Sequence, residues 1–181
     1  MDALVGAIRR MNRWLARLMG FALLSMGALI LVEIVLRATV GSALGGSDEI
    51  SGYVMAAIAT WGFAYALSER AHVRIDLVQR RLPRPVRAWM DVLALALMTA
   101  VALLVTSYGW RVLATTLDRG SRANTPLETP LWIPQSIWFA GWVWFTVAAA
   151  LLLAAALHQA LRGRYAAVAA MAGAHGGEDE R

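Results

Sequence analysis

Two ionisable residues, Glu33 and Arg37, stand within a long apolar stretch and are the first candidates for chemistry in this sequence. They lie one helical turn apart, with the acid on the N-terminal side, which is the order that favours an ion pair. A charge at the centre of a membrane-spanning helix costs about 2.5 to 3.5 kcal/mol on insertion scales, so it indicates pairing or function. Two hypotheses follow: a self-neutralised pair packed against another helix, or a Glu33 that binds a proton or a cation.

The rest of the sequence offers no catalytic constellation. It contains no cysteine, which excludes thiolate metal sites and cysteine nucleophiles. His72 stands apart from other ligand types and is interpreted as an interface residue, and His158 closes an apolar stretch, so we predict no metal or haem site. The run DRGSRAN, from Asp118, faintly resembles a motif of membrane alcohol phosphotransferases, but the other aspartates of that metal site are absent. We therefore predict no catalytic, substrate-binding or metal-binding residue, no cofactor and no enzyme.

Composition indicates a membrane protein. Of the 181 residues, 59% are hydrophobic, whereas a soluble domain of this size carries more charge and less apolar surface. All 17 basic residues are arginine, and the net charge is +5. The arginines gather at the ends of apolar stretches, where membrane topology and anionic lipids explain them. We therefore predict anionic lipids, and not nucleic acid, as partners of these side chains.

Four apolar stretches are each long enough to cross a bilayer as a helix: 18–40, 50–68, 88–110 and 136–158. The segment 50–68 carries no charge and meets an arginine-rich stretch, as expected where a helix leaves the membrane. A signal peptide is the competing interpretation of the first stretch, but signal-peptide cores span only about 7 to 15 residues. We predict an all-α integral membrane protein with one membrane domain over residues 1–181.

Two further segments are predicted to lie at the membrane surface. Residues 2–17 combine apolar and arginine side chains at helical spacing, which is typical of an amphipathic interfacial helix; the alternative is a basic flank that only sets topology. A short interfacial helix is predicted within 77–87, between the second and third spans. The tail, 159–181, is expected to be frayed. The apolar stripe of the first segment consists of Leu4, Ile8, Met11, Leu15 and Leu18.

Arginine counts predict the orientation of the spans. The segments 1–17, 69–87 and 159–181 carry 13 arginines, and the loops 41–49 and 111–135 carry three. The positive-inside rule then predicts that both termini are cytoplasmic. The loop 111–135 also contains three prolines, which exclude one continuous helix and predict an ordered, extended segment.

The second span begins with an acidic pair and is rich in small residues. Asp48 and Glu49 suit the first turn of a helix, with Ser47 as its cap. Small side chains let helices approach closely in lipid, so this span supplies the candidates for helix packing or for a partner interface. Trp61 lies near mid-depth and is expected to pack against protein. The candidates are Gly52, Ala56, Ala59, Trp61, Gly62 and Ala66.

Several short motifs follow one another in an order that resembles a known family. They are the acidic pair before the second helix, an H-[IV]-R-[IV]-D motif at its end, an R-L-P turn, a W-x-D opening of the third helix, and a proline-rich segment that enters the last helix. Their main positions are Asp48, Glu49, His72, Arg74, Asp76, Asp91, Pro126, Pro130, Trp132 and Pro134. Together, over residues 18–157, they resemble the small membrane subunit of tripartite ATP-independent periplasmic (TRAP) transporters.

This resemblance implies a role in a three-part importer of the bacterial inner membrane. In that family a periplasmic binding protein captures a small organic anion, often a carboxylate, and a large subunit moves it with sodium ions by an elevator-like motion. The small subunit is expected to form a 1:1 complex with the large one, to brace it as a scaffold and to help dock the binding protein. Neither the substrate site nor the sodium site is then expected in this chain.

An alternative of a different class is a self-sufficient, proton-coupled exporter that uses Glu33 as small multidrug transporters use their membrane glutamate. Those proteins are shorter and lack a neutralising arginine one turn away, whereas Arg37 is present here. A structural pair is therefore the hypothesis that agrees with the scaffold role.

Overall fold

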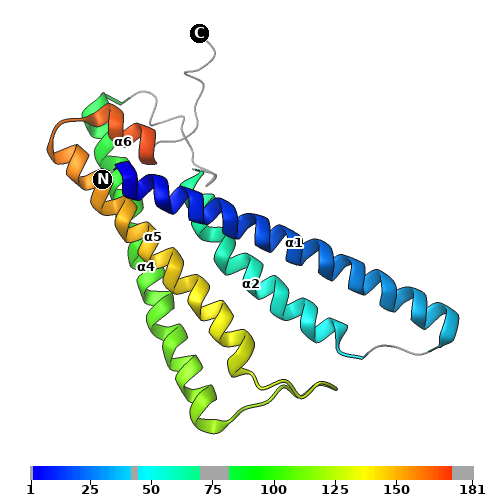
Figure 1. The fold of residues 1–181 in the computed structure, drawn as a ribbon. Coiled ribbons are helices and arrows are strands. Elements are labelled where there is room, and N and C mark those ends of the chain that lie inside the picture. Colours follow the sequence, from blue (N-terminus) through cyan, green and yellow to red (C-terminus); the bar gives the residue numbers. More distant parts are fainter. Residues whose placement is uncertain (1, 42–44, 70–81, 173–181) are drawn as a thin grey trace.

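The computed structural model describes residues 2–41, 45–69 and 82–172 of the chain. Within these described residues, five α-helices follow one another (Figure 1). Four of them are long and apolar enough to cross a membrane, which confirms the predicted all-α membrane fold. The helices are α1 (Asp2–Val40), α2 (Ser47–Ser68), α4 (Arg84–Arg119), α5 (Trp132–Leu161) and α6 (Tyr165–Ala172).

The helices form an open layer rather than a closed bundle. Helix α4 packs against α5, α5 against α2, and α2 against α1. The α1–α2 pair and the α4–α5 pair lie together near the N-terminus and diverge away from it, as the two arms of a V (Figure 1). We call the end near the N-terminus and α6 the joined end, and the opposite end the open end.

The core lies along α5 and is rich in alanine. Ala148, Ala149 and Ala156 of α5 are fully buried, and Ala64 of α2 is buried beside them. Without a hydrophobic driving force between helices in lipid, small side chains allow the close backbone approach that gives van der Waals contact. The same cluster includes Val168 of α6, so α6 closes the joined end.

Helix α1 is continuous over 39 residues, a length of about 58 Å. Residues 2–17, expected as an interfacial helix, and the span 18–40 therefore form one uninterrupted helix. Ile8 and Leu15 of the expected stripe are buried, but Met11 is 48% exposed, and Asn12 is the residue buried between them. This face of α1 contacts α2 and α5, so protein rather than the membrane surface covers it.

Helix α4 extends beyond the expected end of the third span. It ends at Arg119. The N–H of Gly120 donates to the carbonyl of Leu117, and the N–H of Ser121 donates to the carbonyl of Thr116. Gly120 has a φ of 59°, the left-handed conformation with which many helices end. At 36 residues, α4 is about 54 Å long, well beyond the roughly 30 Å of a hydrocarbon core.

Residues 120–131, which we call the finger, form an extended hairpin-like loop between α4 and α5. The N–H of Ala123 donates to the carbonyl of Thr129 at 2.9 Å, and that of Leu131 to Ser121 at 3.0 Å. The predicted ordered, extended segment is confirmed here, although it is shorter than the loop 111–135. Pro134 lies in the first turn of α5, where proline is tolerated because its missing N–H would have no partner inside the helix.

The structure describes parts of the tail, 159–181, and of the segment 77–87, which leads into α4. The tail is not frayed where it is described, because α5 continues to Leu161 and α6 packs against α4 and α5; residues 173–181 lie outside the described part. Residues 77–81 of the short helix predicted within 77–87 lie outside it too, and residues 84–87 are already the first turn of α4.

Helices α2 and α5 make their closest approach at Gly141 of α5. A Cβ atom on Gly141 would lie 2.4 Å from Thr60 Oγ1 and 3.1 Å from Trp61 Cδ1. The glycines that we expected to mediate packing, Gly52 and Gly62 of α2, would gain a Cβ with nothing within 4 Å. The small residue needed at this crossing therefore belongs to α5.

Replacement of Gly141 by alanine should destabilise the protein by about 1–3 kcal/mol, because Thr60 would have to move. Gly62→Ala is the matched control, because it also replaces a helical glycine but its new methyl group would point into open space. This variant should be neutral or stabilising by up to about 1 kcal/mol. Thermal unfolding in detergent, followed by circular dichroism, measures both. Equal midpoints for the two variants would contradict the close approach.

Candidate functional site

The ion pair predicted within the first span is present. Arg37 Nη2 lies 2.9 Å from Glu33 Oε1. The Glu33 side chain is 8% exposed and that of Arg37 is 65% exposed, so the carboxylate faces protein and the guanidinium points outward. The other carboxylate oxygen, Glu33 Oε2, is buried and has no hydrogen-bond partner among the residues that the structure describes. Arg37 neutralises the charge of Glu33, which agrees with a structural pair.

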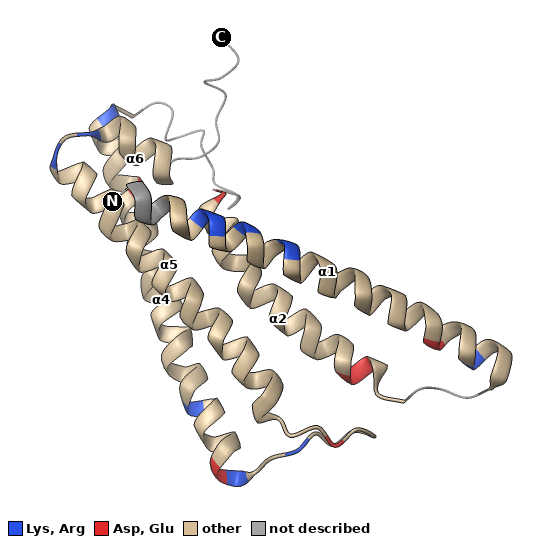
Figure 2. Cartoon of the chain, in the orientation of Figure 1, with Lys and Arg blue, Asp and Glu red and all other residues tan. Residues whose placement is uncertain are grey.

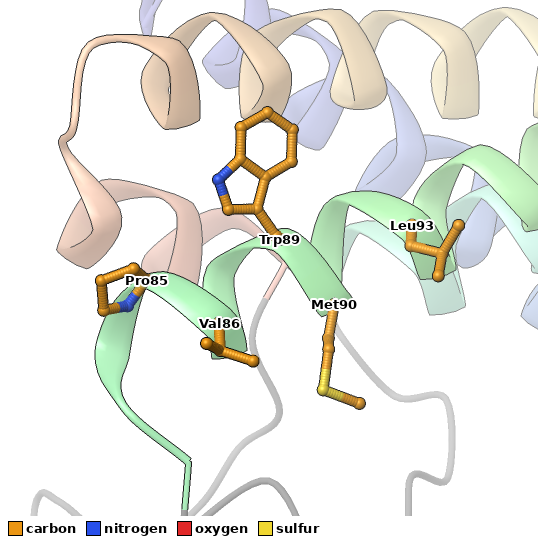
Figure 3. A pocket seen from close by; sticks show the side chains of 5 residues that line it. All are labelled: Pro85, Val86, Trp89, Met90 and Leu93. Carbon is orange, nitrogen blue, oxygen red and sulfur yellow. The ribbon is translucent and has the colours of Figure 1, made fainter.

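No metal site is found in the part of the chain that the structure describes. Within it, no group of three or more His, Asp or Glu side chains could hold a metal ion. An open hollow at the end of α4 is lined by Arg111, Val112, Thr115, Thr116, Arg119 and Ser121. A shallow groove near the start of α4 is lined by apolar side chains, with only the Trp89 indole as a polar group (Figure 3). The residues that line it are Pro85, Val86, Trp89, Met90 and Leu93.

Asn12 forms a deeply buried polar junction between three helices, and sequence analysis missed it. Its side chain is 1% exposed. It donates to the carbonyl of Ala64 at 2.9 Å and to Ser68 Oγ at 2.5 Å, both on α2. The indole N–H of Trp144, on α5, donates to Asn12 Oδ1 at 2.7 Å. One amide thus joins α1, α2 and α5.

A pattern in the sequence could have revealed this junction. Asn12 lies four residues after Ile8 and three before Leu15, so it occupies the apolar stripe itself rather than the arginine face. A lone amide on an otherwise apolar helix face in a membrane needs a hydrogen-bond partner on another helix. What the sequence does not indicate is which helix supplies that partner.

The candidate face of α2 divides into a packed side and a free side. Trp61 packs against protein as expected, since its indole N–H donates to the carbonyl of Ile137 at 3.1 Å. Ala56, Gly62 and Ala66 are partly buried, whereas Gly52 and Ala59 are exposed. The exposed side also includes Met55, at 62%. This side of α2 has no packing partner among the described residues.

Aromatic and hydroxyl side chains complete the contacts of α5. Phe63 of α2 lies 5.4 Å from Trp142 and 5.7 Å from Phe145, between ring centroids. On the other side of α5, the Thr106 hydroxyl of α4 lies 2.9 Å from that of Thr146. Both sets of contacts join helices to one another, and neither forms the lining of a transport path through the membrane.

The acidic pair lies in the first turn of α2, as expected, but the two acids differ in surroundings. Asp48 is exposed. Glu49 accepts hydrogen bonds from the hydroxyl of Tyr53, at 2.6 Å, and from that of Thr125 in the finger. The predicted cap is wrong: Ser47 is the first helical residue, Gly46 takes the cap position, and no side-chain cap bond forms. The fold thereby joins two motifs far apart in the sequence.

The other motif positions have varied surroundings. Asp91 is fully buried in α4. Pro126 is exposed, and Pro130 forms an isolated antiparallel bridge with Arg122. Trp132 is the first residue of α5 and is 46% exposed. The remaining positions, His72, Arg74 and Asp76, lie outside the described residues.

Comparison with known proteins gives one match. The model of the family described as "Tripartite ATP-independent periplasmic transporters, DctQ component" matches residues 26–163. This range includes the ion pair, α2, α4, the finger and α5. No curated protein and no solved structure matches the chain.

Replacement of Asn12 by alanine should destabilise the protein by about 1–3 kcal/mol, because the buried indole N–H of Trp144 would lose its acceptor. Asn124→Ala is the matched control, since Asn124 is exposed on the finger and should change stability by less than about 0.5 kcal/mol. Thermal unfolding in detergent measures both. An Asn12→Ala protein as stable as the control would show that the junction contributes nothing.

Proposed function

The chain belongs to the DctQ family and is a small membrane component of a TRAP transporter, and we propose that it acts there as a scaffold that braces the large, elevator-type subunit. In such a transporter it is a multi-pass protein of the inner membrane and works with a large membrane subunit and a periplasmic binding protein.

The observation that carries this proposal is the open layer. Four helices packed side by side do not enclose a path through the membrane, and a transport path needs polar side chains along its length. In the described residues, Asn12, Thr106 and Thr146 use their polar groups to join helices. A component of this kind supports transport through contacts with another subunit.

The finer proposals follow from surfaces and charge. The exposed side of α2, with Gly52 and Ala59, is proposed to contact the large subunit in a 1:1 complex, because small residues permit close helix approach. The arginines in the first half of α1 and in the α5–α6 turn lie at the joined end (Figure 2). They support a cytoplasmic joined end in contact with anionic lipids.

The open end, with the finger, would then face the periplasm and help to dock the binding protein. Import of a small organic anion together with sodium ions is the transport that we propose for the assembled complex. The substrate and ion sites would lie in the partner subunits.

The exporter alternative has no support. It requires a Glu33 that is free to exchange protons, whereas Arg37 is bonded to this carboxylate at 2.9 Å. The family match also favours a transporter component over a self-sufficient exporter.

The decisive experiment is affinity purification of the chain, tagged at its C-terminus, from its native membrane in mild detergent, with mass-spectrometric identification of its companions. A large permease in equal amount is the expected result. Recovery of the chain alone as a homodimer would contradict the scaffold role.

The same purification locates the contact face. Ala59→Leu adds bulk to the exposed side of α2. Overpacking of a helix contact costs about 1–3 kcal/mol, so this variant should lower recovery of the large subunit several-fold. Ala100→Leu, at an exposed position of α4, is the matched control and should leave recovery unchanged. Undiminished recovery with Ala59→Leu would show that this side of α2 faces lipid.

Replacement of Glu33 by glutamine should change uptake by less than about twofold, because glutamine still accepts a hydrogen bond from Arg37. Uptake is measured in proteoliposomes that contain both membrane subunits, with the ligand that copurifies with the binding protein. Abolished uptake at unchanged complex yield would instead assign an ion-handling role to Glu33.

A further inference from the structure

We propose that the finger, residues 120–131, is a strap that binds the first turn of α2 and thereby sets the spacing of the two arms at the open end. The strap is a property of this chain alone and goes beyond the scaffold role. The helices are packed together at the joined end, and the strap would make the open end of the layer rigid as well.

The geometry of the layer creates the need for such a strap. The α1–α2 and α4–α5 arms are packed together at the joined end, where Asn12 connects three helices. Along α2, contacts with α5 continue to Thr60 and Trp61. Beyond them the first three turns of α2 run away from α5 (Figure 1). Two arms packed at one end form a hinge whose opening angle needs a further constraint.

The finger has the internal order that a strap requires. Besides the two backbone hydrogen bonds that close the hairpin, the N–H of Glu128 donates to the carbonyl of Thr125 at 3.0 Å. The guanidinium of Arg122 donates to the carbonyl of Glu128 at 3.2 Å. Because these bonds fix the tip relative to the two strands of the hairpin, a force on the tip is transmitted to α4 and α5.

A charge-assisted hydrogen bond ties the tip to α2. The hydroxyl of Thr125 donates to Glu49 Oε2, and the hydroxyl of Tyr53 donates to Glu49 Oε1 at 2.6 Å. Tyr53 lies one turn after Glu49 on α2, so it holds the carboxylate in place for the finger. Hydrogen bonds to an ionised acceptor are among the stronger ones in proteins.

An apolar contact beside it makes the attachment specific. The Leu127 side chain lies over Gly46, the residue that precedes α2, and a Cβ atom on Gly46 would be 2.5 Å from Leu127 Cδ1. Gly46 also has a φ of 95°, a conformation that residues with a side chain rarely adopt. Glycine is therefore needed here for two reasons, its conformation and the space that Leu127 occupies.

The test measures the spacing of the arms directly. Because the chain has no cysteine, Met55→Cys on α2 and Leu117→Cys on α4 provide two labelling sites, 62% and 50% exposed. Pulsed electron–electron double resonance on the spin-labelled full chain in lipid nanodiscs gives the distance distribution between the arms. A single narrow distribution is expected for the unaltered finger.

Thr125→Val and Leu127→Ala, made separately, should each broaden that distribution about twofold, since the arms would sample several spacings. Thr125→Ser retains the hydroxyl and should restore the narrow distribution. Thr115→Val is the matched control, because the Thr115 hydroxyl donates to the Arg111 carbonyl of its own helix and, among the described residues, does not join the two arms. Circular dichroism and gel filtration identify any variant that fails to fold. If either Thr125→Val or Leu127→Ala fails to fold, the distance distribution of the other one tests the proposal.

A distribution as narrow in Thr125→Val and Leu127→Ala as in the control would overturn the strap. So would equal broadening in Thr115→Val. Either result would leave the scaffold role intact, since that role is tested by recovery of the large subunit.

Discussion

Close approach to α5 is the constraint on which the rest of the structure depends. Every other described helix packs against α5, and its buried side chains are mostly alanine, with Gly141 where α2 crosses. In lipid, apolar side chains gain little by leaving their surroundings, so van der Waals contact at short backbone distance is what holds helices together. Larger residues along this face would separate the two arms from their common helix.

Polar groups act as cross-links on this close-packed frame. The Asn12 amide joins three helices, the Thr106 and Thr146 hydroxyls join α4 to α5, and Glu49 joins α2 to the finger. A buried donor or acceptor without a partner is costly in a membrane, so the buried contacts of Asn12 specify one arrangement of its three helices. In the described residues, such side chains connect helices at intervals instead of lining one continuous surface, which suits a component that supports transport by another subunit.

The extent of correct prediction differs between local and long-range features. The four spans, the Glu33–Arg37 pair and the ordered finger depend on residues near one another in sequence, and the structure confirms them. The structure differs from the expectation at residues 2–17, which belong to one helix with the first span, and at residues 159–172, which include the end of α5 and α6. The reason is the opposite one. An amphipathic helix face looks the same in sequence whether lipid headgroups or another helix covers it, and alanine-rich α6 gains its stability from packing on α4 and α5.

The sequence alone determined that four of the described helices are long and apolar enough to cross a membrane, because apolar length and charge boundaries record contact with the bilayer residue by residue. The ordered motifs also placed the chain in its family before any contact was known. Tertiary structure decided that the helices form an open layer, that Gly141 rather than Gly52 or Gly62 carries the crossing, and that Asn12 and Glu49 are junctions. The hydrogen bonds among these features join residues 52 to 132 positions apart. A single sequence contains both partners of each contact but does not indicate that they pair.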